Sequence, residues 1–271
     1  MISDALRIIA TTAVITLCAL WPFFPGPYDV LAVPVSTMAQ VFGYVGLLLV
    51  PVGAIWLTTN ASARSPAVQR TFTIITLVAG GLVWAFVSLG GLVSGSVLLT
   101  VVSLVAGIWI FWKLTRRESG IGRALPVYLV TVPTAAFLLQ YALVGRAIEF
   151  SRDRAIRNSG PLIAEIERHY SAFGRYPESL LAEWNDIWPS VIGIKEYRYE
   201  PSGDSYNVIF EQPSNIFGTR EFVVYNPRDQ QIVFGHAIDR LQFTGPALQR
   251  RAGFYAVLDA GHPHWKLFRF D

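Results

Sequence analysis

The sequence predicts an all-α bundle of about five membrane-spanning helices, followed by a small soluble α+β domain in which a helix packs on an antiparallel sheet. Two observations predict this fold class. Residues 1–145 hold 10 charged side chains, whereas residues 146–271 hold 31. Long apolar runs fill the first part, and short alternating runs fill the last. We therefore expect a transmembrane domain (1–145), a helical stalk (146–160) and a soluble domain (161–271).

Five apolar runs are long enough to cross the roughly 30 Å core of a bilayer, which takes about 20 helical residues. Each must be helical, because lipid offers no hydrogen-bond partner to a free backbone group. The runs cover residues 6–24, 38–58, 71–90, 95–113 and 125–145. Only Gly90, Gly91, Ser94 and Gly95 mark a turn between the third run and the fourth. A four-span arrangement, which would reverse the side of the C-terminal domain, is the alternative.

The charges of the loops predict the orientation. The loops after the second and fourth runs are basic, and the loops after the first and third runs carry no lysine or arginine. Since basic loops remain in the cytoplasm, five spans place the N-terminus inside and the C-terminal domain in the periplasm of a bacterial inner-membrane protein. The residues that carry this prediction are Arg64, Arg70, Lys113, Arg116, Arg117 and Arg123.

The composition of the membrane half disfavours several functions. The middle of each run lacks ionisable side chains, and Gln140 is among its strongest polar groups. A proton-coupled transporter or an intramembrane protease needs such groups, so a transporter is the less favoured alternative. The membrane half has a net charge of +4 and the soluble half −1. The basic excess therefore indicates topology and contact with membrane lipid, and we expect no nucleic-acid partner. With no glycine-rich phosphate loop, no cofactor is expected.

An amphipathic helix is predicted at the start of the soluble domain. Asn158-Ser159-Gly160-Pro161 interrupts the stalk, with Asn158 or Ser159 able to cap the next helix and Pro161 tolerated in its first turn. One face of that helix is apolar, and Gly174 is expected to end it. The apolar face comprises Leu162, Ile163, Ile166, Tyr170 and Phe173.

The run from Ile163 to Leu180 resembles the helix end and following turn of type IV pilin-like proteins, especially the major pseudopilins of type II secretion. The matching residues are Tyr170, Gly174, Tyr176, Pro177, Ser179 and Leu180. The resemblance implies a helix that ends in a tyrosine-bearing turn, a short Ser-Leu helix, and an antiparallel sheet packed on the first helix. That family has a single membrane helix, so several spans argue against assembly into a pilus.

Alternating apolar residues predict three strand pairs after this motif. The first joins residues 197–199 to 206–210 through a Pro-Ser-Gly-Asp turn, and the second joins 222–225 to 232–234 through an Asn-Pro-Arg-Asp turn. The third joins residues 254–258 to 265–270. These pairs are expected to form the sheet.

The loop from Asp259 to His264 is the best chemical candidate. Asp259, His262 and His264 could offer oxygen and nitrogen ligands to a metal, but this spacing is a weak zinc pattern. A polar turn with surface histidines is the favoured interpretation. His169 and His236 have no recognisable catalytic partner in the sequence.

The leading hypothesis is a non-enzymatic envelope membrane protein whose extracytoplasmic pilin-like domain binds or scaffolds another envelope protein. The alternative is a small-molecule or metal-binding membrane-anchored enzyme that uses the Asp259–His264 loop. Aromatic residues of the soluble half could form a recognition surface, although core packing is the favoured role for most of them. They are Trp184, Trp188, Tyr197, Tyr199 and Trp265.

Overall fold

A computed structural model of the chain describes residues 2–59, 66–115, 124–180, 186–215, 219–231 and 255–270. The chain divides into two compact units. Unit 1 comprises Met1–Trp21 and Val30–Arg146, and unit 2 comprises Pro22–Asp29 and Ala147–Asp271. The sequence did not predict that Pro22–Asp29, which lies between two apolar runs, belongs to the same unit as the sheet.

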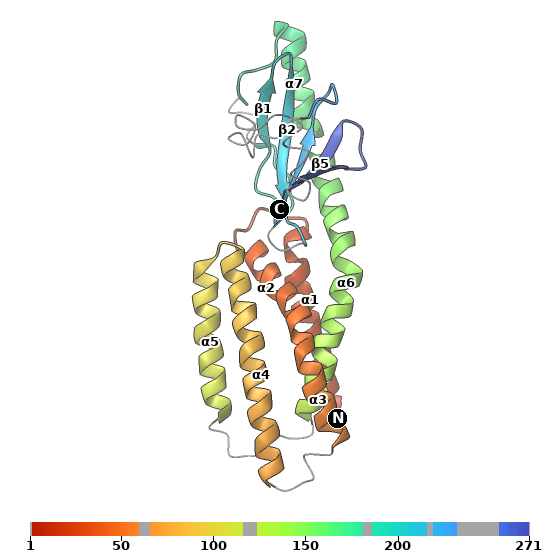
Figure 1. The fold of residues 1–271 in the computed structure, drawn as a ribbon. Helices are drawn as coiled ribbons and strands as arrows, with labels where there is room; N and C mark the ends of the chain where they lie inside the picture. The colour runs from red at the N-terminus through yellow and green to blue at the C-terminus, as the bar shows by residue number, and fades with distance from the viewer. Residues whose placement is uncertain are drawn as a thin grey trace. The chain divides into compact units, whose positions relative to one another are not determined.

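Unit 1 is built from helices that run side by side (Figure 1). They are α1 (Ile2–Leu20), α2 (Ala32–Val45), α3 (Leu49–Thr58), α4 (Pro66–Val93), α5 (Val97–Thr115) and the part of α6 (Ala124–Asn158) up to Arg146, with the short 3-10 turn η2 (Gly46–Leu48). A second 3-10 turn, η1 (Trp21–Phe23), contains the boundary between the two units. Four helical segments of the described chain are long and apolar enough to cross a membrane, and Val97–Ile110 is a shorter apolar helix. A protein with several membrane-length helices is therefore confirmed, whereas the count of five spans stays a prediction.

The third and fourth apolar runs form separate helices. Helix α4 ends at Val93 and α5 begins at Val97. Gly95 between them has a φ of 84°, a left-handed conformation that favours glycine. Helix α5 has 19 residues, which corresponds to about 28 Å at 1.5 Å per residue. Its length is thus close to the thickness of a bilayer core.

The second apolar run is interrupted by η2, and Pro51 gives the physical reason. A proline inside a helix has no N–H to donate, and its ring clashes with the carbonyl four residues earlier. For Pro51 that carbonyl belongs to Leu47, which lies in η2. The α-helical pattern therefore changes to a tighter turn at this point.

Small and polar residues bring the helices of unit 1 close together. The Gln140 side chain donates to the Ala39 carbonyl at 2.9 Å, and a Cβ added at Gly43 would lie 2.0 Å from Gln140 Oε1. Trp84 similarly donates to the Ser103 carbonyl at 2.8 Å. These contacts are what helix association in lipid uses, namely close backbone approach and interhelical hydrogen bonds.

The basic residues that predict orientation are only partly described. Arg70 lies near the start of α4, and Lys113 lies near the end of α5. Arg64, Arg116, Arg117 and Arg123 lie outside the described residues. The orientation of the membrane domain consequently still depends on the sequence.

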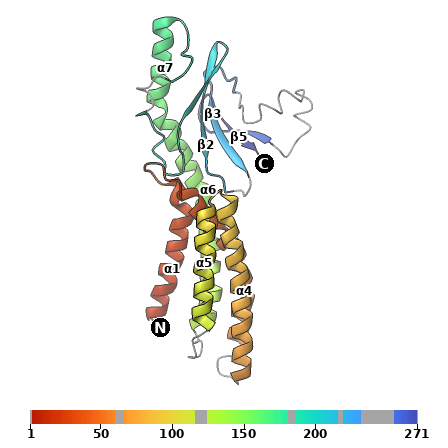
Figure 2. The ribbon, with the colours of Figure 1, turned by 90° about the vertical axis from the view of Figure 1, so that its left-hand side faces the viewer.

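Unit 2 contains a five-stranded sheet in the order β1-β2-β3-β5-β4, in which each neighbouring pair is antiparallel (Figure 2). The strands are β1 (Arg198–Ser202), β2 (Ser205–Gln212), β3 (Arg220–Tyr225), β4 (Tyr255–Asp259) and β5 (Trp265–Phe270). The predicted first and third pairs are present as β1–β2 and β4–β5. Residues 232–234 lie outside the described residues, and β3 pairs with β2 and β5.

Helix α7 (Gly160–Phe173) and the end of α6 pack on one face of this sheet. Leu162 and Ile166 of α7 are fully buried with Val208 and Phe210 of β2 in the same core cluster. A smaller cluster on the opposite face comprises Ile209, Phe222, Val224 and Phe268. The alternation of β2 between the two clusters follows from the two-residue period of a strand.

The residues expected to form a stalk belong mainly to unit 2. Ser151, Ala155 and Ser159 have no exposed surface, and Tyr197 donates its hydroxyl to the Ala155 carbonyl at 2.6 Å. Glu149 and Asp153 lie three or four residues from arginines, and this spacing is typical of a solvated helix face, which is why the sequence predicts a stalk. The small residues between those charges let the sheet domain approach closely, so this segment is part of the domain core.

One of the two predicted boundary signals of α7 is confirmed. Gly174 ends the helix with a φ of 70°, and its N–H donates to the Tyr170 carbonyl at 2.8 Å. At the other end Ser159 is the capping residue, but its hydroxyl donates backward to the Ile156 carbonyl at 2.7 Å. Gly174 is thus confirmed as the stop, and Ser159 makes no side-chain cap for α7.

Candidate functional site

The predicted metal ligands lie on the turn between β4 and β5, and they point to different partners. Asp259 accepts a hydrogen bond from the Gly261 N–H at 2.8 Å, which closes the turn on itself. The His262 ring lies 3.1 Å from Asp153 of α6, and the His264 ring lies 3.2 Å from Asp229. Each histidine therefore pairs with a carboxylate from another element.

This arrangement does not make a ligand set. Among the described residues, no group of three or more His, Cys, Asp and Glu side chains could hold a metal ion. The two histidine–carboxylate pairs instead tie the β4–β5 turn to α6 and to the turn after β3. The polar-turn interpretation of the Asp259–His264 loop fits these contacts.

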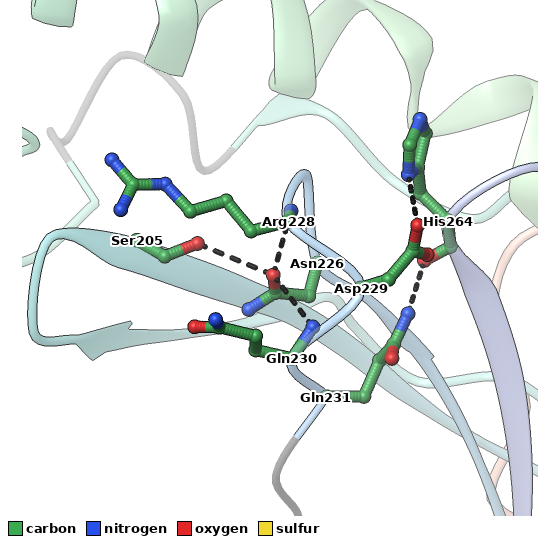
Figure 3. A network of polar contacts seen from close by, with 7 residues as sticks. All are labelled: Ser205, Asn226, Arg228, Asp229, Gln230, Gln231 and His264. Carbon is green, nitrogen blue, oxygen red and sulfur yellow. Dashed lines mark hydrogen bonds and ion pairs between the residues drawn. The ribbon is translucent and has the colours of Figure 1, made fainter.

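Asn226 organises the turn that follows β3 (Figure 3). Its side chain is fully buried, and its amide oxygen accepts from Ser205 Oγ, from the Arg228 N–H and from the Gln230 N–H at 3.3, 2.8 and 3.2 Å. Its amide nitrogen donates to the Tyr206 carbonyl and to Asn207 Oδ1. Both N–H groups and the oxygen of the amide are thus matched to partners, which is the usual condition for burying such a group.

Two residues joined to this turn have strained backbones. Asp229 and His264 have φ values of 57° and 66°, which non-glycine residues seldom adopt. The His264 ring contacts the Asp229 carboxylate, and the His264 carbonyl accepts from the Gln231 side chain at 2.8 Å (Figure 3). The paired side chains and the Asn226 network hold both conformations in place.

The residues of the pilin-like motif surround a cluster of tyrosines. The ring of Tyr170 stacks on that of Tyr176 at 4.4 Å, and Tyr176 packs on Tyr206 of β2 at 4.8 Å. Pro177 is buried, and its carbonyl accepts from the Tyr199 hydroxyl at 2.6 Å. The motif therefore joins the end of α7 to the sheet.

The last two motif residues differ from the resemblance. Ser179 and Leu180 are not helical, so the short helix implied at these two positions is absent there. Leu180 is partly buried against the core, whereas Ser179 is exposed. The segment that continues from them, residues 181–185, lies outside the described residues.

Burial changes the acidity of the tyrosine cluster. Burial raises the pKa of Tyr199 to about 12. Burial, followed by the hydrogen bond that its hydroxyl donates to Glu167 at 2.8 Å, raises the pKa of Tyr206 still further. These phenols remain neutral donors over the whole physiological range of pH.

The tyrosine cluster predicts alkaline instability. The folded state retains phenolic protons above pH 10, where the unfolded chain releases them, so stability is fully present below about pH 10 and falls as the pH rises toward 12. Titration of the full chain in nanodiscs, followed by tyrosinate absorbance, should show a late phase that coincides with unfolding. Tyr199→Phe should reduce this late phase and cost about 1 kcal/mol from the lost hydrogen bond. A late phase of unchanged amplitude would contradict the burial of this hydroxyl.

The end of α7 presents aromatic rings to solvent. Phe173 is 69 % exposed, although it lies on the face that the sequence predicts to be buried. The His169 ring packs on it at 4.6 Å, and His169 Nδ1 lies 3.1 Å from the Arg175 carbonyl. We call His169, Tyr170, Phe173 and Tyr176 the α7-end cluster.

A groove of 420 Å³ forms a second surface feature of unit 2. The Pro22–Asp29 segment pairs with residues 190–193 through four backbone hydrogen bonds, including Gly193 N–H to the Pro22 carbonyl at 2.7 Å and Asp29 N–H to the Ile192 carbonyl at 3.0 Å. Tyr28 and Trp188 line the groove and are 43 % and 54 % exposed. Its wall is fixed to α6 because Arg154 donates to the Ser190 carbonyl at 3.1 Å and Asn158 to the Pro189 carbonyl at 2.7 Å.

The aromatic residues considered as a recognition surface fall into different places. Tyr197 and Trp265 are buried in the core, and Tyr199 is partly buried. Trp188 is the exposed member, and Trp184 lies outside the described residues. No sequence signal marks Asn226 as important, because a single Asn in an Asn-Pro turn is typical of many surface turns.

Comparison of the chain with protein-family models, with curated proteins and with solved structures found no match. The fold and its surfaces define a broad class, namely a protein with several membrane-length helices and a small antiparallel sheet domain.

Proposed function

We propose that this chain is a non-enzymatic, multi-pass protein of the bacterial inner membrane whose unit 2 lies in the periplasm and binds another envelope protein. The observation that carries the proposal is the exposure of Phe173 at the end of α7. The five spans, the orientation from basic loops and the pilin-like packing of α7 on the sheet are parts of the same proposal.

The α7-end cluster has the chemistry of a protein-binding surface. Leaving a phenylalanine ring in water forgoes about 1.5–3 kcal/mol of burial free energy. Binding energy in protein interfaces is concentrated in a few such aromatic anchors. Phe173 is held by His169, and Tyr170 by Tyr176, so the rings are ordered before a partner arrives. A preordered surface loses less entropy on binding.

The partner should present a complementary apolar pocket with a polar rim. Glu165 and Arg168 form an ion pair at 2.7 Å one to two turns before Phe173 on α7. Such charges at the edge of an apolar patch favour the correct partner more than they add affinity. A protein partner with a mixed polar and apolar surface suits this end of the helix better than an acyl chain.

A single-cysteine experiment tests both binding and orientation. Cys18 is the one cysteine of the chain, so Cys18→Ser gives a background for Ala172→Cys, an exposed site beside Phe173. A membrane-impermeant maleimide should label Ala172→Cys in spheroplasts. A photo-crosslinker attached at the same site should capture one discrete envelope protein in native membranes.

Two variants control the result. Ala164→Cys is also exposed on α7, about 12 Å along the helix, and should crosslink weakly. Phe173→Ser in the Ala172→Cys chain should reduce the crosslink about fivefold or more, since the loss of an aromatic anchor costs at least about 1 kcal/mol. A crosslink yield that Phe173→Ser leaves unchanged would refute the binding surface. Labelling of Ala172→Cys only after membrane disruption would refute the orientation.

A further inference from the structure

We propose that the groove beside Trp188 is a headgroup site for an anionic phospholipid at the membrane surface. The proposal is independent of the protein partner at the α7 end, because the groove is lined by different residues of unit 2. It depends on the membrane-length helices and on the contacts of the Pro22–Asp29 segment.

The covalent chain keeps this groove near the ends of two membrane-length helices. Helix α1 ends at Leu20 and α2 begins at Ala32. Pro22 is two residues beyond Leu20, so its Cα lies within about 8 Å of that helix end. Gly193 N–H donates to the Pro22 carbonyl at 2.7 Å. This hydrogen bond holds residues 190–193, beside the groove, to the part of the chain that directly follows α1.

The other end of the pairing gives the same result. Asp29 N–H donates to the Ile192 carbonyl at 3.0 Å, and Asp29 is three residues before the start of α2. Both ends of the Pro22–Asp29 segment are therefore fixed within a few residues of a helix that is long and apolar enough to cross a membrane. A groove built on this segment must lie close to the bilayer surface on that side.

The residues at the groove suit that depth. Tyr28 and Trp188 are about half exposed, and such amphipathic rings concentrate at the headgroup level of membranes. Phe24, on the same segment, is also exposed at 37 %. In bulk water these exposed rings would form an apolar patch that promotes aggregation. At a bilayer surface their apolar parts contact lipid while their polar atoms remain hydrated.

The charge of the groove indicates an anionic ligand. Lys195 lines it with a side chain that is 66 % exposed. Its ion pair with Glu196 is long, at 3.7 Å, and solvated, so it is weak and leaves the ammonium able to bind a phosphate. Arg154 adds a second positive charge behind the Ser190 wall. A basic residue near a membrane surface contributes about 1 kcal/mol toward anionic lipid.

Its size is also appropriate. A volume of 420 Å³ lies within the range of about 300–1,000 Å³ that small-molecule sites occupy. This size and the charge of Lys195 together fit a phosphate-bearing headgroup, and the short links to α1 and α2 favour a lipid of the surrounding bilayer as its source.

Fluorescence quenching in nanodiscs tests the proposal with the full chain. Nanodiscs carry a minor fraction of brominated lipid, as either phosphatidylglycerol or phosphatidylcholine, in a background of the other lipid. The contribution of Trp188 is the difference between the wild type and Trp188→Phe. We expect brominated phosphatidylglycerol to quench Trp188 about twofold more than brominated phosphatidylcholine, and Lys195→Gln to remove this preference. Trp265, which is buried in the sheet core, is the control. Its contribution, which is the difference between the wild type and Trp265→Phe, should be quenched by neither lipid.

Three outcomes would overturn the headgroup site. Trp188 that is quenched by neither lipid would place the groove away from the bilayer. Equal quenching by both lipids would reduce it to a non-selective surface contact. Loss of the preference on adding soluble glycerol phosphate, at concentrations that leave the nanodiscs intact, would identify a site for a soluble anion. None of these results bears on crosslinking at Ala172→Cys, so the two proposals can fail separately.

Discussion

Replacing Asn226 by aspartate should destabilise unit 2 by about 2–4 kcal/mol, although the two side chains have the same shape. The amide nitrogen donates to the Tyr206 carbonyl and to Asn207 Oδ1. An aspartate oxygen in that place faces two acceptors, and its charge would be fully buried. Asn226→Ala should cost a similar amount, because it also leaves the N–H groups of Arg228 and Gln230 without their acceptor.

Hydrogen–deuterium exchange of the full chain in nanodiscs measures this effect. Amides of β2 and β3 should exchange faster in both Asn226 variants, and the helices of unit 1 should be unaffected. Gln230→Ala is the matched control. The Gln230 side chain is exposed, and Gln230 contacts Asn226 through its backbone N–H, which alanine retains. It should change stability by no more than about 0.5 kcal/mol. Unchanged exchange in Asn226→Asp would show that the amide does not organise this turn.

Gly193→Ala should release the Pro22–Asp29 segment from the sheet domain. An added Cβ would lie 2.6 Å from Pro22 Cβ, 2.7 Å from Pro213 Cγ and 2.8 Å from the Pro22 carbonyl oxygen. Proline rings and backbone cannot turn aside as a flexible side chain does, so the backbone must move. We expect a cost of about 1–3 kcal/mol and loss of the hydrogen bond from Gly193 to Pro22.

The expected signature of Gly193→Ala is local. The amides of Gly26, Asp29 and Ile192, which donate within the pairing, should lose protection from exchange before the β2–β3 amides do. Gly160→Ala is the control, because nothing lies within 4 Å of its added Cβ and alanine favours a helix. If Gly193→Ala leaves these three amides protected, the pairing is not a tight contact, and the basis of the lipid site is removed as well.

Much of the architecture could be predicted because it depends on local patterns. Twenty apolar residues in a row must be helical in lipid, and alternating residues around Gly203 and Gly261 predicted the β1–β2 and β4–β5 pairs. Gly174 could be predicted as a helix stop because its left-handed backbone suits glycine. Each of these signals lies within a few neighbouring residues.

The surfaces could not be predicted in the same way. The periodicity of α7 marks Phe173 as apolar but does not show whether another element covers its ring, which is 69 % exposed. The charges near Asp153 indicated a solvated stalk, whereas Tyr197 and the small Ala155 bring that segment into the core. In both cases the burial of a side chain depends on a partner far away in sequence.

The sequence by itself determined the class of the elements: helices of membrane length, a helix stopped at Gly174 and antiparallel strand pairs. The tertiary structure alone decided which distant segments share a unit. Pro22–Asp29 joins the sheet domain across more than half of the chain through hydrogen bonds to residues 190–193, and Glu221 is buried between Gln212 and Arg269 of neighbouring strands. Apart from proline, every residue has the same backbone N–H and carbonyl groups, so the backbone pairing of Pro22–Asp29 leaves no pattern in side-chain chemistry.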